Sequence, residues 1–399
     1  MNNENIEITT QEPELSESAK RAKSSLKFTR VVLLLAMVVF AVVLLISNKD
    51  KINTDNFKRL AAKLDMGVSI TSSPDSSFID YDYDLSAKIK TYKDGIVRVT
   101  AEDLVITDNI GTNFQSVLTG FNNPQVITSS KYVCAYDRGG KRLIVTNSFN
   151  VVFDTTLEQN IVSVSMNDNG YIAVITESEA YKNHLLVFNS SFKEVYKLNS
   201  MHRYFVCADI SPDNNNVVVS SLYVKDQNVT PQINCYSLSK EKPLWTAEFE
   251  GNVAVDINKK TNGTTVALFD WGVCVLDKNG NEKYRYEFKN DILQCYSISN
   301  DKYNVVVTSA SHDGVSTITV FNTNGKQILQ KKLNYSAKSV DLKFNRISLL
   351  STNDIELLTL KGKQLSLIAN TNDATQVMLC DKNSVVLVSA SSTVYAQAK

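Results

Sequence analysis

The feature that most limits how this chain can fold is a hairpin-like phrase that recurs through most of its length. Each copy has an alternating apolar run, a polar turn and a second run, as in LIVTNSFNVVFDTTL from Leu143. This pattern is typical of two antiparallel strands joined by a tight turn. Asn, Asp and Ser suit the turn because their short side chains hydrogen-bond the nearby backbone. In seven copies the first turn residue falls in register, at Asp108, Asn147, Asn189, Ser237, Asp277, Asn322 and Thr359.

A second phrase precedes each hairpin and consists of a short apolar alternation, a polar turn and a β-branched run. Examples are VSVSMNDNGYIAVIT from Val162 and VCADISPDNNNVVVSS from Val206. Together the two phrases predict four strands about every 41 residues, a period typical of a β-propeller. One blade cannot bury both faces of its sheet alone, so the blades must stack around an axis.

The predicted starts of the inner strands set the number of blades. They fall near residues 86, 124, 161, 205, 252, 293, 338 and 375. We therefore predict an all-β fold with eight blades, or seven if the first or last unit is irregular. The last unit has three strands, and residues 76–84 precede the first blade. We expect this run to supply the missing strand, which would close the ring and leave no open edge.

An apolar run, VVLLLAMVVFAVVLLI from Val31 to Ile46, precedes the repeats. It holds no charge, Gly or Pro and is just long enough to span a bilayer when flanking Lys and Arg side chains reach the interfaces. The alternatives are a buried core helix and a cleaved signal peptide. The following SNKDK offers no small-residue cleavage site. We therefore predict an uncleaved signal anchor whose transmembrane helix, residues 31–47, has the lipid bilayer as its partner.

The chain thus divides into four predicted parts. Residues 1–30 form a tail, acidic and disordered at first and then basic; residues 48–66 form a linker with a short helix over 54–65; residues 67–399 form the propeller. The basic residues flanking the apolar run tie by the positive-inside count. Because large domains translocate largely regardless of charge, we expect a single-pass cell-membrane protein with an extracellular propeller. The alternative is a cytoplasmic propeller.

Bulk composition argues against nucleic-acid binding and against a fold held by disulfides. Lys plus Arg and Asp plus Glu both number 42, so no basic excess indicates nucleic-acid binding. The six cysteines are scattered, and no two are spaced as C-x-x-C. A chain of this size does not need disulfides to hold its core, so buried free thiols are expected.

Three phrases carry a resemblance to known propeller families. SPDNNNVVVSS (Ser211 to Ser221) and NDNGYIAVITES (Asn167 to Ser178) resemble the repeats of WD-repeat and YVTN-type propellers. The hairpin VFNTNGK (Val320 to Lys326) resembles the quinoprotein-like superfamily. Over about residues 50–399 the layout is similar to an uncharacterised Firmicutes family of membrane-anchored propellers, the domain of unknown function numbered 5711. The resemblance implies the architecture and says little about activity.

The sequence offers few groups for catalysis or metal binding. His184, His202 and His312 are the three histidines, and their spacing supports neither a catalytic triad nor zinc. The alternating Asp80, Asp82 and Asp84 would share one face of a strand, but they lack the Gly and Glu of a calcium loop. We therefore predict no catalytic residues, no metal site and no cofactor.

Four loop residues, Asp270, Trp271, His312 and Asp313, are the candidates for a binding face at one mouth of the central channel. Loops on a rigid propeller suit recognition of a partner. The predicted function is therefore a non-enzymatic module of the cell envelope that binds a protein or glycan, with no nucleic-acid partner. The alternative is an envelope enzyme of quinoprotein-like type with its site at the channel.

Overall fold

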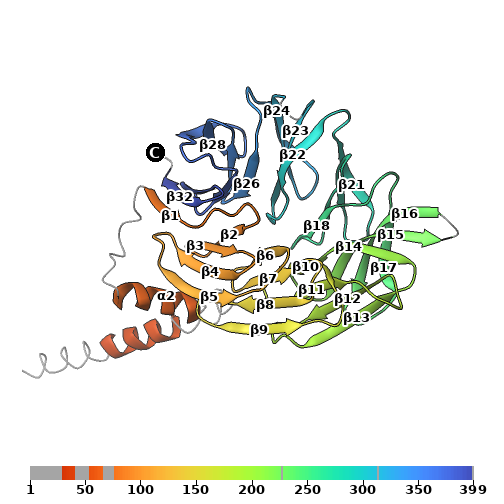
Figure 1. Cartoon of the computed structure of the whole chain (residues 1–399), viewed down its shortest axis with the longest axis horizontal. Coiled ribbons are helices and arrows are strands. Elements are labelled where there is room, and N and C mark those ends of the chain that lie inside the picture. The colour runs from red at the N-terminus through yellow and green to blue at the C-terminus, as the bar shows by residue number, and fades with distance from the viewer. Residues whose placement is uncertain (1–28, 41–53, 66–75, 226–227, 312–313, 398–399) are drawn as a thin grey trace, which may run out of the picture. The chain divides into compact units, whose positions relative to one another are not determined.

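A computed structural model describes residues 29–40, 54–65, 76–225, 228–311 and 314–397 (Figure 1). The chain divides into two compact units, residues 1–58 and residues 59–399. Residues 29–40 are helical, and a second helix, α2, spans Thr54–Asp65, the residues expected for the linker helix. All sheets belong to the second unit.

The strands form eight four-stranded sheets, which confirms the prediction of eight blades. Blades 1 and 2 contain β2 (Lys88–Tyr92), β3 (Gly95–Val99), β4 (Asp103–Asp108), β5 (Asn113–Leu118), β6 (Pro124–Thr128), β7 (Val133–Asp137), β8 (Arg142–Thr146) and β9 (Val151–Thr156). Blades 3 and 4 contain β10 (Ile161–Met166), β11 (Ile172–Thr176), β12 (Asn183–Phe188), β13 (Glu194–Ser200), β14 (Arg203–Ile210), β15 (Asn216–Lys225), β16 (Asn228–Ser237) and β17 (Pro243–Glu248).

The remaining four blades follow the same plan. Blades 5 and 6 contain β18 (Asp256–Lys259), β19 (Thr265–Leu268), β20 (Gly272–Leu276), β21 (Glu282–Glu287), β22 (Ile292–Ser297), β23 (Tyr303–Ser309), β24 (Ser316–Asn322) and β25 (Gln327–Lys332). Blades 7 and 8 contain β26 (Ser339–Lys343), β27 (Arg346–Leu350), β28 (Asp354–Thr359), β29 (Gln364–Ala369), β30 (Gln376–Leu379), β31 (Ser384–Val388), β32 (Ser392–Gln397) and β1 (Ser76–Asp80).

Within a blade the strands are antiparallel and follow the chain from the inside of the ring outward. We label them A to D in that order. The A strands of most successive blades contact one another, as β2 contacts β6 and β26 contacts β30. Contact between β2 and β30 closes the ring. The observed A strands begin within a few residues of the predicted starts.

Blade 8 is closed by the strand from the start of the propeller, as predicted. Its order is β1-β32-β31-β30, and β1 pairs with β32 from Ser76↔Ala396 to Asp80↔Ser392. The strand ends at Asp80, so Asp82 and Asp84 do not share a strand face with it. Beyond the strand, the Tyr81 hydroxyl donates to the Ser392 carbonyl of blade 8 at 2.8 Å.

The core lies between neighbouring blades rather than at the centre of the ring. B and C strands are almost wholly buried, as in β11 and β20, whereas D strands such as β21 alternate exposed and partly buried residues. Between blades 3 and 4, Leu185 and Val187 pack with Phe205, Val217 and Val219. Burying one such aliphatic side chain contributes about 1.5–3 kcal/mol. Each blade is therefore stabilised by both of its neighbours.

The C–D turns confirm the register predicted from the repeats. Asn322 Oδ1 accepts hydrogen bonds from the backbone N–H groups of Asn324 at 3.0 Å and Lys326 at 2.9 Å. Thr359 Oγ1 accepts one from the N–H of Lys363 at 3.1 Å. These side chains satisfy backbone donors that the ladder leaves free at the turn.

The predicted membrane helix, residues 31–47, is described only in part. Residues 31–40 lie in the helical stretch and are exposed, and residues 41–47 lie outside the described residues. Among the helices that the structure describes, none has both the length and the apolar character needed to cross a bilayer. Most of the predicted tail, residues 1–28, also lies outside the described part of the chain.

Candidate functional site

The antiparallel order of the blades gives the ring two different ends. The A–B and C–D turns lie at one end, which we call the turn face. The B–C loops and the connections from each D strand to the next A strand lie at the other, which we call the loop face. The predicted residues Asp270 and Trp271 lie in the B–C loop of blade 5, on the loop face.

Exposed large apolar side chains are concentrated on the loop face. Outside the strands, those in its loops are Tyr83, Leu85, Tyr181, Met201, Val255 and Val315. The described turns of the opposite face expose only Ile110 and Phe344. Single exposed apolar residues are normal, but a bias toward one face is typical of a binding surface. The loop face is therefore the candidate functional surface.

Blade 4 extends furthest at this face. Its B and C strands, β15 and β16, have 10 residues each, whereas those of the other blades have 4 to 7. Figure 1 shows the β15–β16 hairpin projecting at the right edge of the view. Val229 lies beside its tip and is 57% exposed. Met201, in the connection into the same blade, is 66% exposed.

Aromatic and cationic side chains surround the base of this hairpin. The Lys182 ammonium lies 4.9 Å from the ring centroid of Tyr204, and the Arg203 guanidinium lies 4.9 Å from that of Tyr223. Arg203 Nε also donates to Gln232 Oε1 at 3.0 Å, which fixes the guanidinium. Such contacts hold amphipathic groups in place before a partner arrives, which lowers the entropy cost of binding.

The predicted residues of blade 5 are held by stacking. Trp271 stacks on Phe269 at 4.6 Å between ring centroids, and the Arg285 guanidinium lies 4.8 Å from the Trp271 ring. Asn252 donates a side-chain hydrogen bond to exposed Asp270. The other two candidates, His312 and Asp313, fall in the B–C loop of blade 6 and lie outside the described residues.

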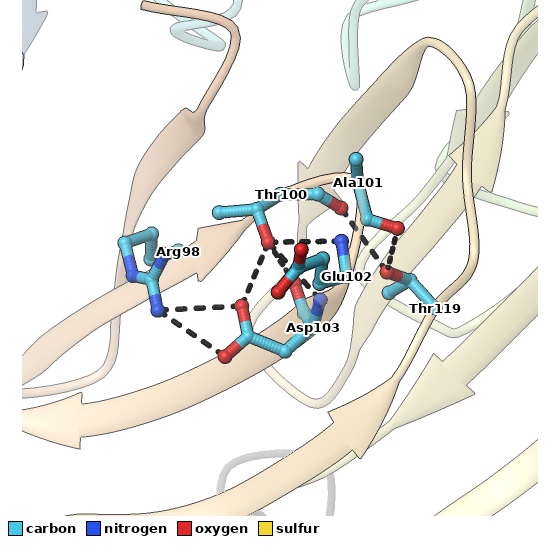
Figure 2. Close-up of polar contacts among 6 residues, drawn as sticks. All are labelled: Arg98, Thr100, Ala101, Glu102, Asp103 and Thr119. Atoms are coloured by element: carbon cyan, nitrogen blue, oxygen red, sulfur yellow. Dashed lines mark hydrogen bonds and ion pairs between the residues drawn. The ribbon is translucent and has the colours of Figure 1, made fainter. Parts of the chain in front are cut away.

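Hydrogen bonds brace the loops of blade 1 at this face (Figure 2). Thr100 Oγ1 accepts from the backbone N–H groups of Glu102 at 3.2 Å and Asp103 at 3.0 Å. Arg98 pairs with the Asp103 carboxylate at 3.3 Å. Thr119 Oγ1, from the next connection, donates to the carbonyl of Thr100 at 3.1 Å. The two adjacent loops are thereby joined.

A second group of polar side chains lines the central channel. Lys90 on β2 of blade 1 and Asp256 on β18 of blade 5 belong to opposite sides of an eight-membered ring and still interact electrostatically. Burial lowers the pKa of Lys90, and the carboxylates of Asp341 and Asp256 oppose that shift. Lys343 Nζ, on β26, donates to Thr91 Oγ1 at 2.8 Å. The channel thus contains both signs of charge.

Asp209, on β14, is one of the perturbed acids of this group. Burial raises its pKa to about 7, although hydrogen bonding from the Lys259 backbone opposes the shift. Its Oδ2 accepts from the Lys259 N–H at 2.7 Å and from Asn258 Nδ2 at 3.2 Å. Asp341 Oδ2 bonds the next blade in the same way, accepting from the Leu379 N–H at 2.8 Å. Both acids therefore join neighbouring blades, and Asp209 can also exchange a proton near pH 7.

Metal binding finds no support in the described residues. Among them, no group of three or more His, Cys, Asp and Glu side chains could hold an ion. In the predicted acidic run, the Asp84 carboxylate accepts from the Ser86 N–H at 2.7 Å and from the Ser86 hydroxyl at 2.6 Å. These local bonds hold Asp84 in the connection from blade 8 to blade 1.

Sequence reasoning did not identify the projecting hairpin or the channel acids. The hairpin left one signal, since Asn189 and Ser237 are further apart than any other neighbouring pair of aligned turn residues. The channel acids left no signal in the sequence, because a lone Asp in an alternating strand gives the same pattern whether that face of the strand contacts solvent or a channel. Their proximity depends on ring closure.

Comparison with known proteins assigns the chain to a family. The family model described as "Family of unknown function (DUF5711)" matches residues 76–395, from the first residue of β1 into β32. The chain belongs to this family. No curated protein sequence matches the chain.

Solved structures of other propellers resemble this member of DUF5711 in fold. BamB from Moraxella catarrhalis is 14% identical, with a TM-score of 0.52 over 80% of this chain and 98% of BamB. Sqt1 from Saccharomyces cerevisiae is 9% identical, with a TM-score of 0.58 over 82% and 100% of the two chains. The C-terminal WD40 domain of Sif2 is 12% identical, with a TM-score of 0.56 over 80% and 97%. Identities this low establish a shared fold alone.

Proposed function

We propose that this DUF5711 protein is a membrane-anchored, non-enzymatic interaction module of the cell envelope that binds a partner protein through its loop face. The exposed apolar side chains on that face support the proposal. Blade 4 is the favoured centre of the contact, because Met201, Tyr204 and Val229 surround a projecting, braced hairpin. Tyr, Met and Arg are enriched at the centres of protein interfaces. A loop-lined face with a projecting hairpin also suits a protein better than a small molecule, which usually needs a concave site.

The binding face can be tested by site-specific crosslinking in cells. A photo-crosslinking phenylalanine analogue would replace Val229 on the loop face or, as the control, Phe344 on the turn face. Both positions are exposed, so either substitution should leave the fold intact. We expect a discrete protein adduct from position 229, which the added substitution Met201→Ser weakens about tenfold. An adduct that forms from position 344 alone would contradict the proposed face.

The anchor and its orientation need a separate test. The support is the charge-free run from Val31 to Ile46, which precedes the propeller. Protease added to intact, wall-stripped cells carrying tags at both ends of the chain reports the side on which each part lies. Digestion of the propeller with survival of the N-terminal tag is expected. A protected propeller would place it in the cytoplasm, and release of the chain by carbonate washing would contradict an integral anchor.

A second candidate function, an envelope enzyme of quinoprotein-like type, draws support from Asp209 in the channel. An acid with a pKa of about 7 can serve as a general acid or base near neutral pH. Its two hydrogen bonds to blade 5 also explain its presence structurally, which makes this the less favoured candidate. Purified protein that shows quinone absorbance and loses an associated activity on Asp209→Asn would support the enzyme.

A further inference from the structure

A cavity of about 690 Å³ lies between blades 6 and 7, where they approach the loop face. Blade 6 contributes Lys331 from β25, the connection into blade 7 contributes Tyr335, and β28 and β29 contribute Glu356 and Leu367. Sites for small molecules usually measure about 300–1,000 Å³. The cavity is off the ring axis and is separate from the hairpin of blade 4.

Glu356 is a charged residue at a C-strand position that is uncharged in blades 1 to 6. In blades 1 to 7 each C strand has a β-bulge, and the residue one place before it faces the preceding blade. Glu356 is that residue in blade 7, where its side chain is 7% exposed. In blades 1 to 6 the corresponding residues are Val105, Ile144, Leu186, Asn234, Cys274 and Thr319.

The residue that pairs with Glu356 on the D strand is apolar, whereas the equivalent residue of blades 1 to 6 is polar. Leu367 pairs with Glu356 and is 56% exposed. The residues in the same place in blades 1 to 6 are all polar, namely Ser116, Asp154, Lys197, Thr246, Arg285 and Gln330. Cross-strand partners share one face of a sheet, so Glu356 and Leu367 form adjoining polar and apolar walls of the cavity.

Glu356 has little compensation from the protein for its burial. The Tyr335 hydroxyl donates to Glu356 Oε2 at 2.5 Å. Burial, together with this carboxylate, raises the pKa of the Tyr335 phenol, which therefore stays a donor at neutral pH. Among the described residues Glu356 forms no ion pair, although Lys331 lines the same cavity. A buried carboxylate with one neutral donor lowers stability, so a role in binding explains this residue better than a role in folding.

We infer that this cavity binds a neutral saccharide of one or two hexopyranose rings. Its two lysines and two carboxylates balance, which favours an uncharged ligand. Planar carboxylate and amide groups, here Glu356, Asp354 and Gln364, can each bond two neighbouring hydroxyls. The exposed Leu367 side chain offers an apolar surface to the C–H face of a sugar ring. The inference stands independently of the protein partner proposed for the loop face.

The test is calorimetric titration of the full-length protein in nanodiscs with maltose and with N,N′-diacetylchitobiose. We expect at least one disaccharide to bind, and Glu356→Leu and Leu367→Ser each to weaken that binding about tenfold or more. Glu356→Leu restores the type of residue found at Leu186 of blade 3, so it should not lower the melting temperature. Leu365→Ser is the matched control, because Leu365 is exposed on the same strand but does not line the cavity.

Each other outcome overturns the inference. Absence of binding by both disaccharides at millimolar concentration rejects the ligand class. Binding that survives Glu356→Leu and Leu367→Ser rejects the cavity as its site. Should Glu356→Leu fail to fold, the exposed Leu367→Ser variant decides alone. A further outcome is that neither sugar binds but a lysine-containing dipeptide does. If Glu356→Gln abolishes that binding, the cavity is a site for a cationic ligand instead.

Discussion

Asp209 illustrates how a single buried acid can join two blades and also have a pKa near neutrality. Its carboxylate joins blade 4 to the backbone of blade 5, and burial raises its pKa to about 7. Glu356 differs, because one tyrosine hydroxyl is its hydrogen-bond partner and it lines a cavity. At the residue scale, a buried acid can therefore be assigned to structure or to binding by the bonds that it makes.

The raised pKa of Asp209 predicts that this residue contributes less to folding stability as the pH rises. The group favours the folded state while protonated, so its contribution is complete below pH 3.8 and declines as pH rises through about 7. Asp209→Asn should therefore gain unfolding free energy relative to the wild type between these pH values, by at most about 1.4 kcal/mol per pH unit. Above pH 7 the difference should level off.

Denaturant unfolding at several pH values measures this difference. Measurements at about pH 2.5 are the internal control, because Asp209 is then largely neutral in both the folded and the unfolded chain and any remaining difference reflects the substitution itself. A wild-type-minus-variant difference that stays constant from pH 4 to pH 8 would show that Asp209 does not carry the predicted shift.

At the scale of elements, β1 decides whether the ring is closed. It is the outer strand of blade 8, although it comes from the start of the propeller. Ile79 packs against the cluster formed by Met378, Val386 and Tyr395, whereas Phe78 on the other face of the strand is exposed. The strand therefore joins blade 8 by one buried face and one ladder of hydrogen bonds.

These two neighbouring residues provide a matched pair for testing closure. Ile79→Asp places a charge in the inward contact and should lower stability by about 2–4 kcal/mol. Phe78→Asp changes the exposed face of the same strand and should alter it by no more than about 0.5 kcal/mol. Thermal unfolding compares the two variants. Equal losses would mean that β1 is not held by its inward face.

At the scale of the whole molecule, the closed ring gives every blade two neighbours and leaves no blade at an end. Cys134, Cys235 and Cys274 are free, buried and distributed over blades 2, 4 and 5. Burial raises the pKa values of Cys134 and Cys274 to about 12, so their thiols react only after opening. These three side chains therefore report on the opening of separate parts of the ring.

We expect the three thiols to share one free energy of opening. A ring that must break before any blade separates should expose all of them together. Alkylation in low denaturant, followed by mass spectrometry of each cysteine peptide, measures the three rates, and unfolded protein supplies the reference rate for each thiol. One cysteine labelled about tenfold faster than the others would instead show that its blade opens alone.

The sequence by itself determined the eight blades, the places of the C–D turns and the strand that closes the ring. These are local properties, because strand alternation and the hydrogen bonds of Asn322 or Thr359 depend on residues a few places apart. Of the four predicted binding residues, His312 and Asp313 lie outside the described structure. Asp270 and Trp271 lie on the loop face, and their role in binding stays a prediction.

Only the tertiary structure decided which groups meet. Lys90 and Asp256 interact across a channel that exists once blade 8 contacts blade 1. Glu356 and Tyr335 share a cavity because blades 6 and 7 pack side by side. The Lys182 ammonium beside Tyr204, near the projecting hairpin of blade 4, likewise comes from the adjoining blade 3. The repeat specifies each blade from nearby residues, whereas a binding surface arises from side chains that separate blades bring together.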